Sequence, residues 1–183
     1  MKSRALLIVA LKQELPKDGL ADWTIVYTGV GKVNAAITLM TALTEAKPDL
    51  LINYGTAGAI KTGLAQIVEV GQSVQCDMDA RPLGIALGAT PFETGTERFT
   101  LSESPLICGT ADRFVTSAPE LTCDLVDMEL YALAKIASLE QIPLKSFKFI
   151  SDNADDSSQQ DWKNSLPDAA SGFLRIQDKL LSL

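Results

Sequence analysis

Short apolar runs separated by turn residues dominate the hydrophobic pattern of the chain. Most of these runs are continuous, not alternating, which is typical of strands in a sheet covered on both faces. They predict buried strands over residues 5–10, 24–28, 49–54, 67–75, 105–108 and 144–150.

Helical spacing of apolar residues follows in three other stretches. The first covers residues 33–43 and ends before Pro48, and the second covers residues 128–136 and ends before Pro143. A last helix is predicted with Ser165 as its N-cap and Pro167 in its first turn.

The alternation of strands and helices indicates the fold class. It predicts an α/β fold, with a single domain over residues 1–183 and a mixed, mainly parallel sheet flanked by helices in three layers. Residues 79–100 form the longest irregular stretch, which we interpret as a mobile loop.

Composition narrows the function classes. With 183 residues, 46% of them hydrophobic, the chain can bury one sizeable core. A net charge of −7 argues against a nucleic-acid partner, which would need clustered Lys and Arg. The chain contains no histidine, which excludes Ser-His and Cys-His catalysis, and we expect no metal site.

Cysteine usage and the apolar segments indicate the compartment. Cys76, Cys108 and Cys123 have no metal-like spacing and predict reduced thiols in a cytoplasmic protein. The apolar run near the amino terminus is interpreted as a first strand, not a signal peptide. No stretch approaches the roughly 20 apolar residues of a membrane span, so no membrane partner is expected.

Two acidic segments near the end of the chain carry the candidate chemistry. Glu129 opens the second predicted helix, and Asp152 follows an apolar strand, where it would stand at the carboxyl edge of the sheet. Open parallel sheets bind ligands at that edge. Structural roles are also open: Glu129 could stabilise the helix dipole, and Asp152 could cap a helix or form an Asx-turn.

Two glycine-containing segments follow predicted strands. Residues 28–34 lack the third glycine of a dinucleotide fingerprint and the Ser or Thr of a P-loop, so they are either a plain tight turn or a turn that a ligand approaches. Residues 53–58 place Thr56 between Gly55 and Gly58, as either a turn or a ligand contact.

Taken in order along the chain, these segments resemble the purine nucleoside phosphorylase and nucleosidase family. The resemblance is greatest to its 5′-methylthioadenosine/S-adenosylhomocysteine nucleosidase branch. Ala-Leu-Lys-Gln-Glu, ending at Glu14, is similar to Ala-Met-Glu-Glu-Glu, and Gly-Val-Gly-Lys from Gly29 is similar to Gly-Ile-Gly-Lys. Residues 53–58 resemble Asn-Thr-Gly-Ser-Ala-Gly, residues 126–129 resemble Val-Glu-Met-Glu, and residues 150–155 resemble Ile-Ser-Asp-X-Ala-Asp.

The resemblance implies a role for each matched residue and a nucleoside phosphorylase-like fold. Asp152 would donate a proton to N7 of the purine, and Glu14 would activate the attacking water. Glu129 would hold the ribose hydroxyls while Met128 packs on the sugar. The remaining substrate contacts implied are Phe114, stacking on the base, the backbone of Val115, and Thr56, Gly58 and Asp127.

The function predicted is hydrolysis of the N-glycosidic bond of a purine nucleoside without a cofactor. Methylthioadenosine, S-adenosylhomocysteine and futalosine are candidate substrates, and residues 77–93 are expected to read the 5′ group. A phosphate-dependent phosphorylase and a non-catalytic nucleoside-binding protein are the alternatives. The resemblance also implies a homodimer with its active site near the interface.

Overall fold

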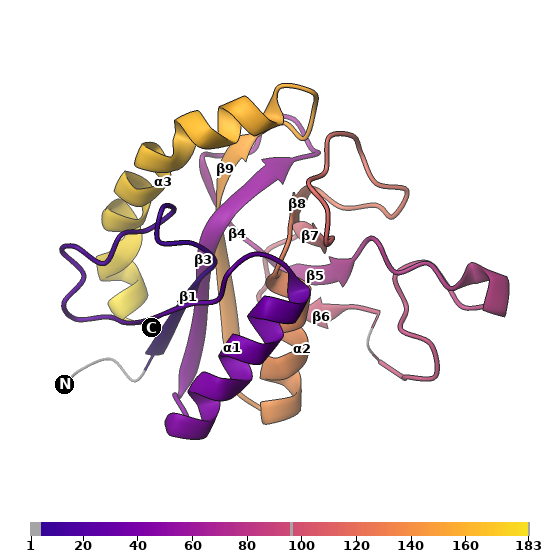
Figure 1. Cartoon of the computed structure of the whole chain (residues 1–183), viewed down its shortest axis with the longest axis horizontal. Coiled ribbons are helices and arrows are strands. Elements are labelled where there is room, and N and C mark those ends of the chain that lie inside the picture. Colours follow the sequence, from indigo (N-terminus) through magenta and orange to yellow (C-terminus); the bar gives the residue numbers. More distant parts are fainter. Residues whose placement is uncertain (1–4, 96, 183) are drawn as a thin grey trace.

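A computed structural model describes residues 5–95 and 97–182. Its layers are a central sheet, helices α1 (Lys32–Glu45) and α2 (Leu130–Glu140) on one face, and helix α3 (Ser158–Leu181) on the other (Figure 1). The strands are β1 (Ala5–Val9), β2 (Thr24–Tyr27), β3 (Leu50–Ala59), β4 (Ile67–Glu69), β5 (Gln72–Gln75), β6 (Phe99–Thr100), β7 (Ile107–Thr110), β8 (Leu125–Asp127) and β9 (Leu144–Asp152).

The sheet is mixed and mainly parallel, which confirms the predicted fold class. Its strand order is β2-β1-β3-β8-β7-β5-β6, and β9 pairs with both β3 and β4. Strands β1, β3 and β9 run parallel, whereas β3 meets β8 in an antiparallel pair near its carboxyl end. Strand β3 therefore joins the two parts of the sheet.

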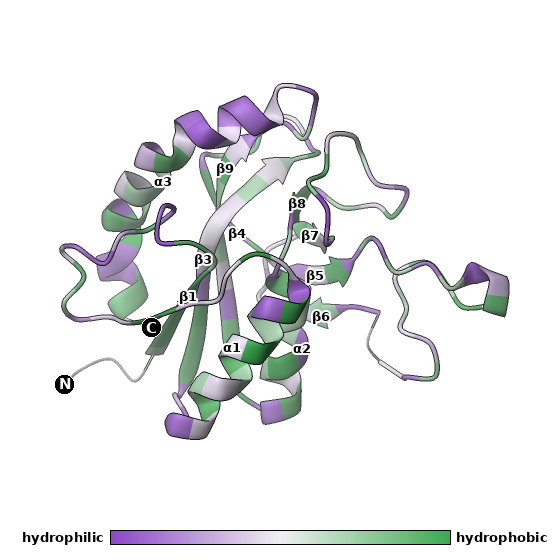
Figure 2. Ribbon diagram, viewed as in Figure 1, coloured by the Kyte–Doolittle hydropathy of each residue, from purple (hydrophilic) through white to green (hydrophobic). Residues whose placement is uncertain are grey.

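Apolar side chains fill the space on both faces of the sheet. Leu39 of α1 and Leu133 of α2 are fully buried against the sheet on one side. On the other side, the ring of Phe173 in α3 packs edge-on against Tyr54, with centroids 5.0 Å apart. Figure 2 shows hydrophobic colours on β1 and polar turns along the first half of α3.

The strand predictions differ from the structure in three places. Strand β3 continues to Ala59, so Gly55 and Gly58 lie in a strand and not in a turn. The predicted strand over residues 67–75 is divided into β4, which pairs with β9, and β5, which pairs with β6 and β7. Gly71 between them passes so close to Ser104 that a Cβ would lie 1.6 Å from its carbonyl oxygen. The very short strands β6 and β8 were not predicted.

The start of the last helix was also predicted wrongly. Helix α3 begins at Ser158, and Pro167 lies inside it. The turn before it explains the earlier start: Asp155 Oδ1 accepts hydrogen bonds from Ser157 N and Ser157 Oγ, at 2.9 and 2.7 Å, and Ser158 Oγ accepts one from Asp155 N. These bonds begin the helix seven residues upstream of the Ser165 signal.

The irregular stretch after β5 contains the short 3-10 helix η1 (Arg81–Leu83) and projects away from the sheet (Figure 1). Arg81 pairs there with Asp79 and Glu120, at 2.6 and 2.5 Å. Within the described residues, no helix is long and apolar enough to cross a membrane.

Candidate active site

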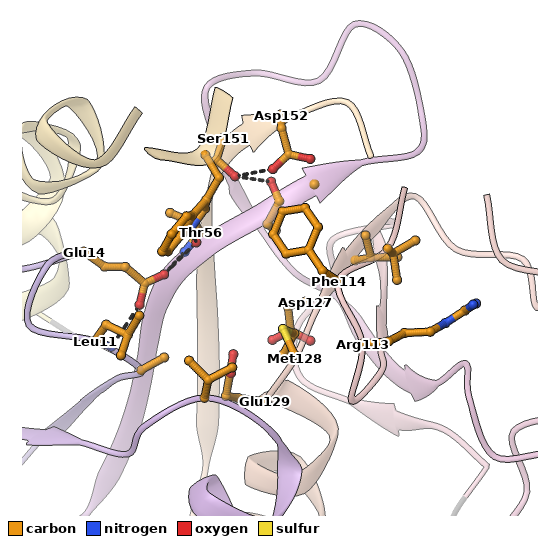
Figure 3. A pocket seen from close by; sticks show the side chains of 17 residues that line it. Leu11, Glu14, Thr56, Arg113, Phe114, Asp127, Met128, Glu129, Ser151 and Asp152 are labelled. Atoms are coloured by element: carbon orange, nitrogen blue, oxygen red, sulfur yellow. Dashed lines mark hydrogen bonds between the residues drawn. The ribbon is translucent and has the colours of Figure 1, made fainter. Parts of the chain in front are cut away.

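A cavity of about 170 Å³ opens at the carboxyl edge of the parallel strands β1, β3 and β9. Glu14, Glu129 and Asp152 reach it from different parts of the sheet and border it on separate sides (Figure 3). The full lining is Ala10, Leu11, Glu14, Val30, Thr56, Ala57, Gly58, Arg113, Phe114, Val115, Val126, Asp127, Met128, Glu129, Ser151, Asp152 and Trp162. The sequence-predicted site residues therefore meet at one place.

Glu14 lies in the turn after β1 and is 4% exposed. Its Oε1 accepts hydrogen bonds from Thr56 N at 2.9 Å and Thr56 Oγ1 at 2.6 Å, and its Oε2 accepts one from Leu11 N at 3.0 Å. A carboxylate has about four lone-pair sites. Three of them are occupied by these bonds, which leaves room to accept one more hydrogen bond.

Glu129 precedes the first turn of α2 and is 8% exposed. Its Oε1 accepts a hydrogen bond of 2.9 Å from Gly31 N, at the start of α1. Burial, reinforced by the charge of Asp127, raises the pKa of Glu129 to about 8, although Lys148 and the Gly31 bond act in the opposite direction. Burial therefore favours the protonated form of this side chain.

Asp152 owes its position to an irregularity in strand pairing. Ala57 pairs with Ile150 and Gly58 pairs with Asp152, so Ser151 is an extra residue in β9. Such bulges turn side chains at functional sites. Asp152 Oδ1 accepts a 2.9 Å bond from Ala154 N, which is the Asx-turn considered from sequence, and Oδ2 lies 2.7 Å from Ser151 Oγ.

Gly58 makes room for this carboxylate. A Cβ at position 58 would lie 2.8 Å from Asp152 Oδ1 and 3.3 Å from the Cβ of Ala154. Contacts under 3.0 Å force an atom to move, so only glycine is compatible with the observed place of the Asp152 side chain.

Asp127 lines the cavity, but its carboxylate is already bonded. Its Oδ1 accepts from Thr110 Oγ1 at 2.6 Å, and its Oδ2 accepts from Leu130 N at 2.9 Å and from Lys148 Nζ at 2.7 Å. These contacts fix the start of α2 and pair with a fully buried cation. Asp127 therefore has a structural role, in addition to the substrate contact that the resemblance implies.

Met128, Phe114 and Val115 also line the cavity, as expected from the resemblance. Phe114 is 45% exposed at the rim, whereas Val115 is buried. The hydroxyl of Thr56 is bonded to Glu14, so the first partner of Thr56 is that carboxylate.

Other residues of the cavity were not foreseen, among them Trp162 from α3, Val30 from the turn before α1, and Arg113. The guanidinium of Arg113 points away from the carboxyl groups (Figure 3). No residue of the stretch 77–93 lines the cavity, so the cavity lining does not support the expectation that this stretch reads the substrate.

Comparisons with known proteins agree with this fold. The model of the phosphorylase superfamily matches residues 20–84 of this chain. The 5′-methylthioadenosine/S-adenosylhomocysteine nucleosidase of Haemophilus ducreyi is 29% identical over 177 residues, covering 80% of this chain and 74% of that protein.

Solved structures extend the comparison to the fold. The chain superposes on the 5′-methylthioadenosine/S-adenosylhomocysteine nucleosidase of Helicobacter pylori with a TM-score of 0.88, at 18% identity, covering 100% of this chain and 99% of the other. It superposes on the futalosine hydrolase of Helicobacter pylori with a TM-score of 0.80, at 20% identity, covering 96% and 97%. These findings confirm the resemblance to the purine nucleoside phosphorylase and nucleosidase family and to its nucleosidase branch.

Proposed function

We propose that this chain hydrolyses the N-glycosidic bond of a purine nucleoside. The observation that supports it best is the convergence of Glu14, Glu129 and Asp152 on one cavity at the carboxyl edge of the sheet. The similar proteins from Haemophilus ducreyi and Helicobacter pylori are nucleosidases or a futalosine hydrolase by name.

Cleavage of this bond passes through a cationic, oxocarbenium-like sugar. The reaction needs an acid for the leaving base, a base for the attacking water, and negative charge close to the sugar. In the proposal, Asp152 protonates N7 of the purine and Glu14 takes a proton from water. Glu129 binds the ribose hydroxyls, and Met128 packs against the sugar.

The Ser151 hydroxyl can form a hydrogen bond with Asp152 in either protonation state of the carboxyl group. The Ser151 hydroxyl has one hydrogen but two acceptors in reach, Ala57 O at 3.3 Å and Asp152 Oδ2 at 2.7 Å. When Asp152 is ionised, Ser151 donates to it. When Asp152 is protonated, Ser151 turns to Ala57 O and accepts the acid proton, so both states of Asp152 fit one backbone.

Contacts around the start of α1 favour hydrolysis over phosphorolysis. Phosphate binds well at a helix N-terminus with cations nearby. Here Gly31 N donates to Glu129 and Lys32 N donates to Asp112, at 2.9 and 2.7 Å. The Lys32 ammonium pairs with Asp77 at 2.5 Å. A phosphate would have to displace the protein's own carboxylates.

Phe114 at the rim is proposed to stack on the purine, with the backbone of Val115 reading the base edge. The nature of the 5′ group is left to experiment, with methylthio, homocysteinyl and futalosine-type substituents as candidates. Three free, buried cysteines suit reduced thiols, and we place the reaction in the cytoplasm.

A homodimer is part of the proposal because α1 carries an apolar stripe beside the cavity. Val30 lines the cavity and is 41% exposed, and Val33, Ile37 and Met40 continue the stripe at 67%, 62% and 40%. A second copy would cover this face close to the substrate. Sedimentation velocity should show a dimer that Val33→Glu dissociates; a monomer at micromolar concentrations of the wild type would contradict it.

Release of free base tests the function directly. Adenosine, inosine, methylthioadenosine, S-adenosylhomocysteine and futalosine are each incubated with the protein, with and without phosphate, and the products are separated by chromatography. Asp152→Asn is expected to lower kcat by roughly 10²–10⁴-fold, and Glu14→Gln by a comparable factor. Glu45→Gln, an exposed change on α1, serves as the control.

Each alternative predicts a different outcome of this assay. A phosphorylase would require phosphate and form ribose 1-phosphate. A non-catalytic binding protein would bind adenine or a nucleoside in calorimetry, yet release no base at high protein concentration. Near wild-type turnover by Asp152→Asn would show that the acid is assigned wrongly.

A further inference from the structure

A chain of hydrogen bonds leads from helix α3 to the carboxylate of Glu14. The indole Nε1 of Trp162 donates to Thr56 Oγ1 at 2.9 Å, and Thr56 Oγ1 donates to Glu14 Oε1 at 2.6 Å. Trp162 lies 106 residues from Thr56 in the sequence and lines the same cavity.

The chemistry of the indole fixes the direction of this chain. Indole nitrogen can only donate a hydrogen bond, whereas a hydroxyl donates one and accepts two. Because Trp162 occupies an acceptor position of Thr56, the single hydroxyl hydrogen of Thr56 is directed toward Glu14. The short final distance of 2.6 Å is typical of a hydroxyl bonded to a carboxylate.

We propose that Trp162 is a positioning residue for Glu14, acting through the hydroxyl of Thr56. This inference rests on the proposed function, in which Glu14 activates water. The indole locks the Thr56 rotamer, Thr56 holds Glu14 Oε1, and Leu11 N holds Oε2, so that the carboxylate keeps one orientation beside the cavity.

The position of Trp162 on α3 links its hydrogen bond with Thr56 to the segment that follows Asp152. Helix α3 starts just after Asp152, and Trp162 lies in its second turn. The same segment thus supports both proposed catalytic carboxyl groups, Asp152 through the strand end and Glu14 through the indole. Displacing the first turns of α3 would disturb the acid and the base together.

A purely steric role for the Trp162 ring is the competing explanation, and single variants distinguish the two. Trp162→Phe retains most of the ring and removes the N–H, whereas Thr56→Val removes the hydroxyl and Thr56→Ser retains it. Lys163→Ala, an exposed change in the same turn of α3, is the matched control.

Steady-state kinetics provide the first readout. Trp162→Phe should lower kcat by roughly 2- to 10-fold, the range of one neutral hydrogen bond, with KM little changed. In the Thr56→Val background the same substitution should have no further effect, because the bond is already absent. Thr56→Ser should retain most of the coupling. Equal loss from Trp162→Phe in both backgrounds would overturn the proposal.

Proton–nitrogen NMR of the indole groups provides a readout that needs no activity. The chain contains two tryptophans, and among the described residues Trp23 Nε1 has no hydrogen-bond partner, so its signal is an internal reference. Thr56→Val should move the Trp162 indole signal upfield and leave that of Trp23 in place. An unmoved Trp162 signal would refute the contact, whereas failure of the wild type to release base would refute only the proposed function.

Discussion

The buried pair of Lys148 and Asp127 provides the most quantitative test of how this site is supported. Each side chain is 1% exposed, and Lys148 Nζ lies 2.7 Å from Asp127 Oδ2. Burial alone lowers the pKa of Lys148, but the Asp127 carboxylate, together with Cys108 and Glu129, raises it, and the net shift is upward. The ammonium is therefore charged, and each ion depends on the other.

Removing the cation leaves a buried carboxylate that, among the described residues, keeps its hydrogen bonds from Thr110 Oγ1 and Leu130 N. Breaking a buried pair in this way costs about 3–5 kcal/mol of unfolding free energy. For a chain of this size, that lowers Tm by roughly 6–20 °C. We expect Lys148→Met to be destabilised by this amount, and the double variant with Asp127→Asn to be less destabilised than Lys148→Met alone.

Urea unfolding at fixed protein concentration, followed by tryptophan fluorescence, measures these differences. Lys145→Met is the matched control, because Lys145 lies on the same strand and pairs with Glu69 at 3.7 Å with both side chains about one-third exposed. That exposed pair should contribute about 0–1 kcal/mol. A Lys148→Met variant within about 1 kcal/mol of wild type, or a double variant with additive losses, would refute the reasoning.

Two further predictions concern the other side chains of the cavity. Burial and the charge of Asp127 raise the pKa of Glu129 from 4.5 to about 8. The protonated side chain therefore stabilises the folded protein. This contribution is complete below pH 4.5 and is lost as the pH rises through about 8. Unfolding free energy measured in urea should fall over that window and stay flatter in Glu129→Gln; equal slopes would contradict the burial of this acid. Gly58→Ala should lower kcat by about 10²-fold by displacing the Asp152 carboxylate. Gly55→Ala, whose Cβ would meet Glu14 at an ordinary 3.6 Å, should lose much less, and similar losses in the two variants would count against the Gly58 contact.

Periodicity predicted much of the architecture, because long buried strands and amphipathic helices have local signatures. It located the start of β1, β2 and β9 and the helices α1 and α2 to within a few residues. It could not find β8, a strand of three residues that exists through its pairing with β3 and β7. It also misplaced the start of α3. Ser165 and Pro167 are typical of a helix start, but the hydrogen-bonded turn at Asp155 begins the helix at Ser158.

The candidate acids were predictable for a different reason. Glu129 and Asp152 stand at the start of a helix and the end of a strand, where a sheet gathers side chains at one edge, whereas Glu14 was identified only through the family resemblance. Their partners were not predictable, because those contacts span large separations along the chain. Gly31 bonds Glu129 across 98 residues, and Trp162 bonds Thr56 across 106.

The three carboxyl groups differ in their surroundings, and this difference fits the different tasks proposed for them. Glu14 accepts three hydrogen bonds, as suits the group proposed to take a proton from water. Glu129 is buried with a single donor and becomes an anion most readily when a ligand brings hydroxyl groups and a positive sugar. Asp152 faces a serine that can either donate or accept, so it can lose its proton to the base without a change of backbone. The environment of each carboxyl group, and not its residue type, separates the proposed acid from the proposed base. Replacing Asp152 with Glu and Glu14 with Asp would therefore not exchange their roles.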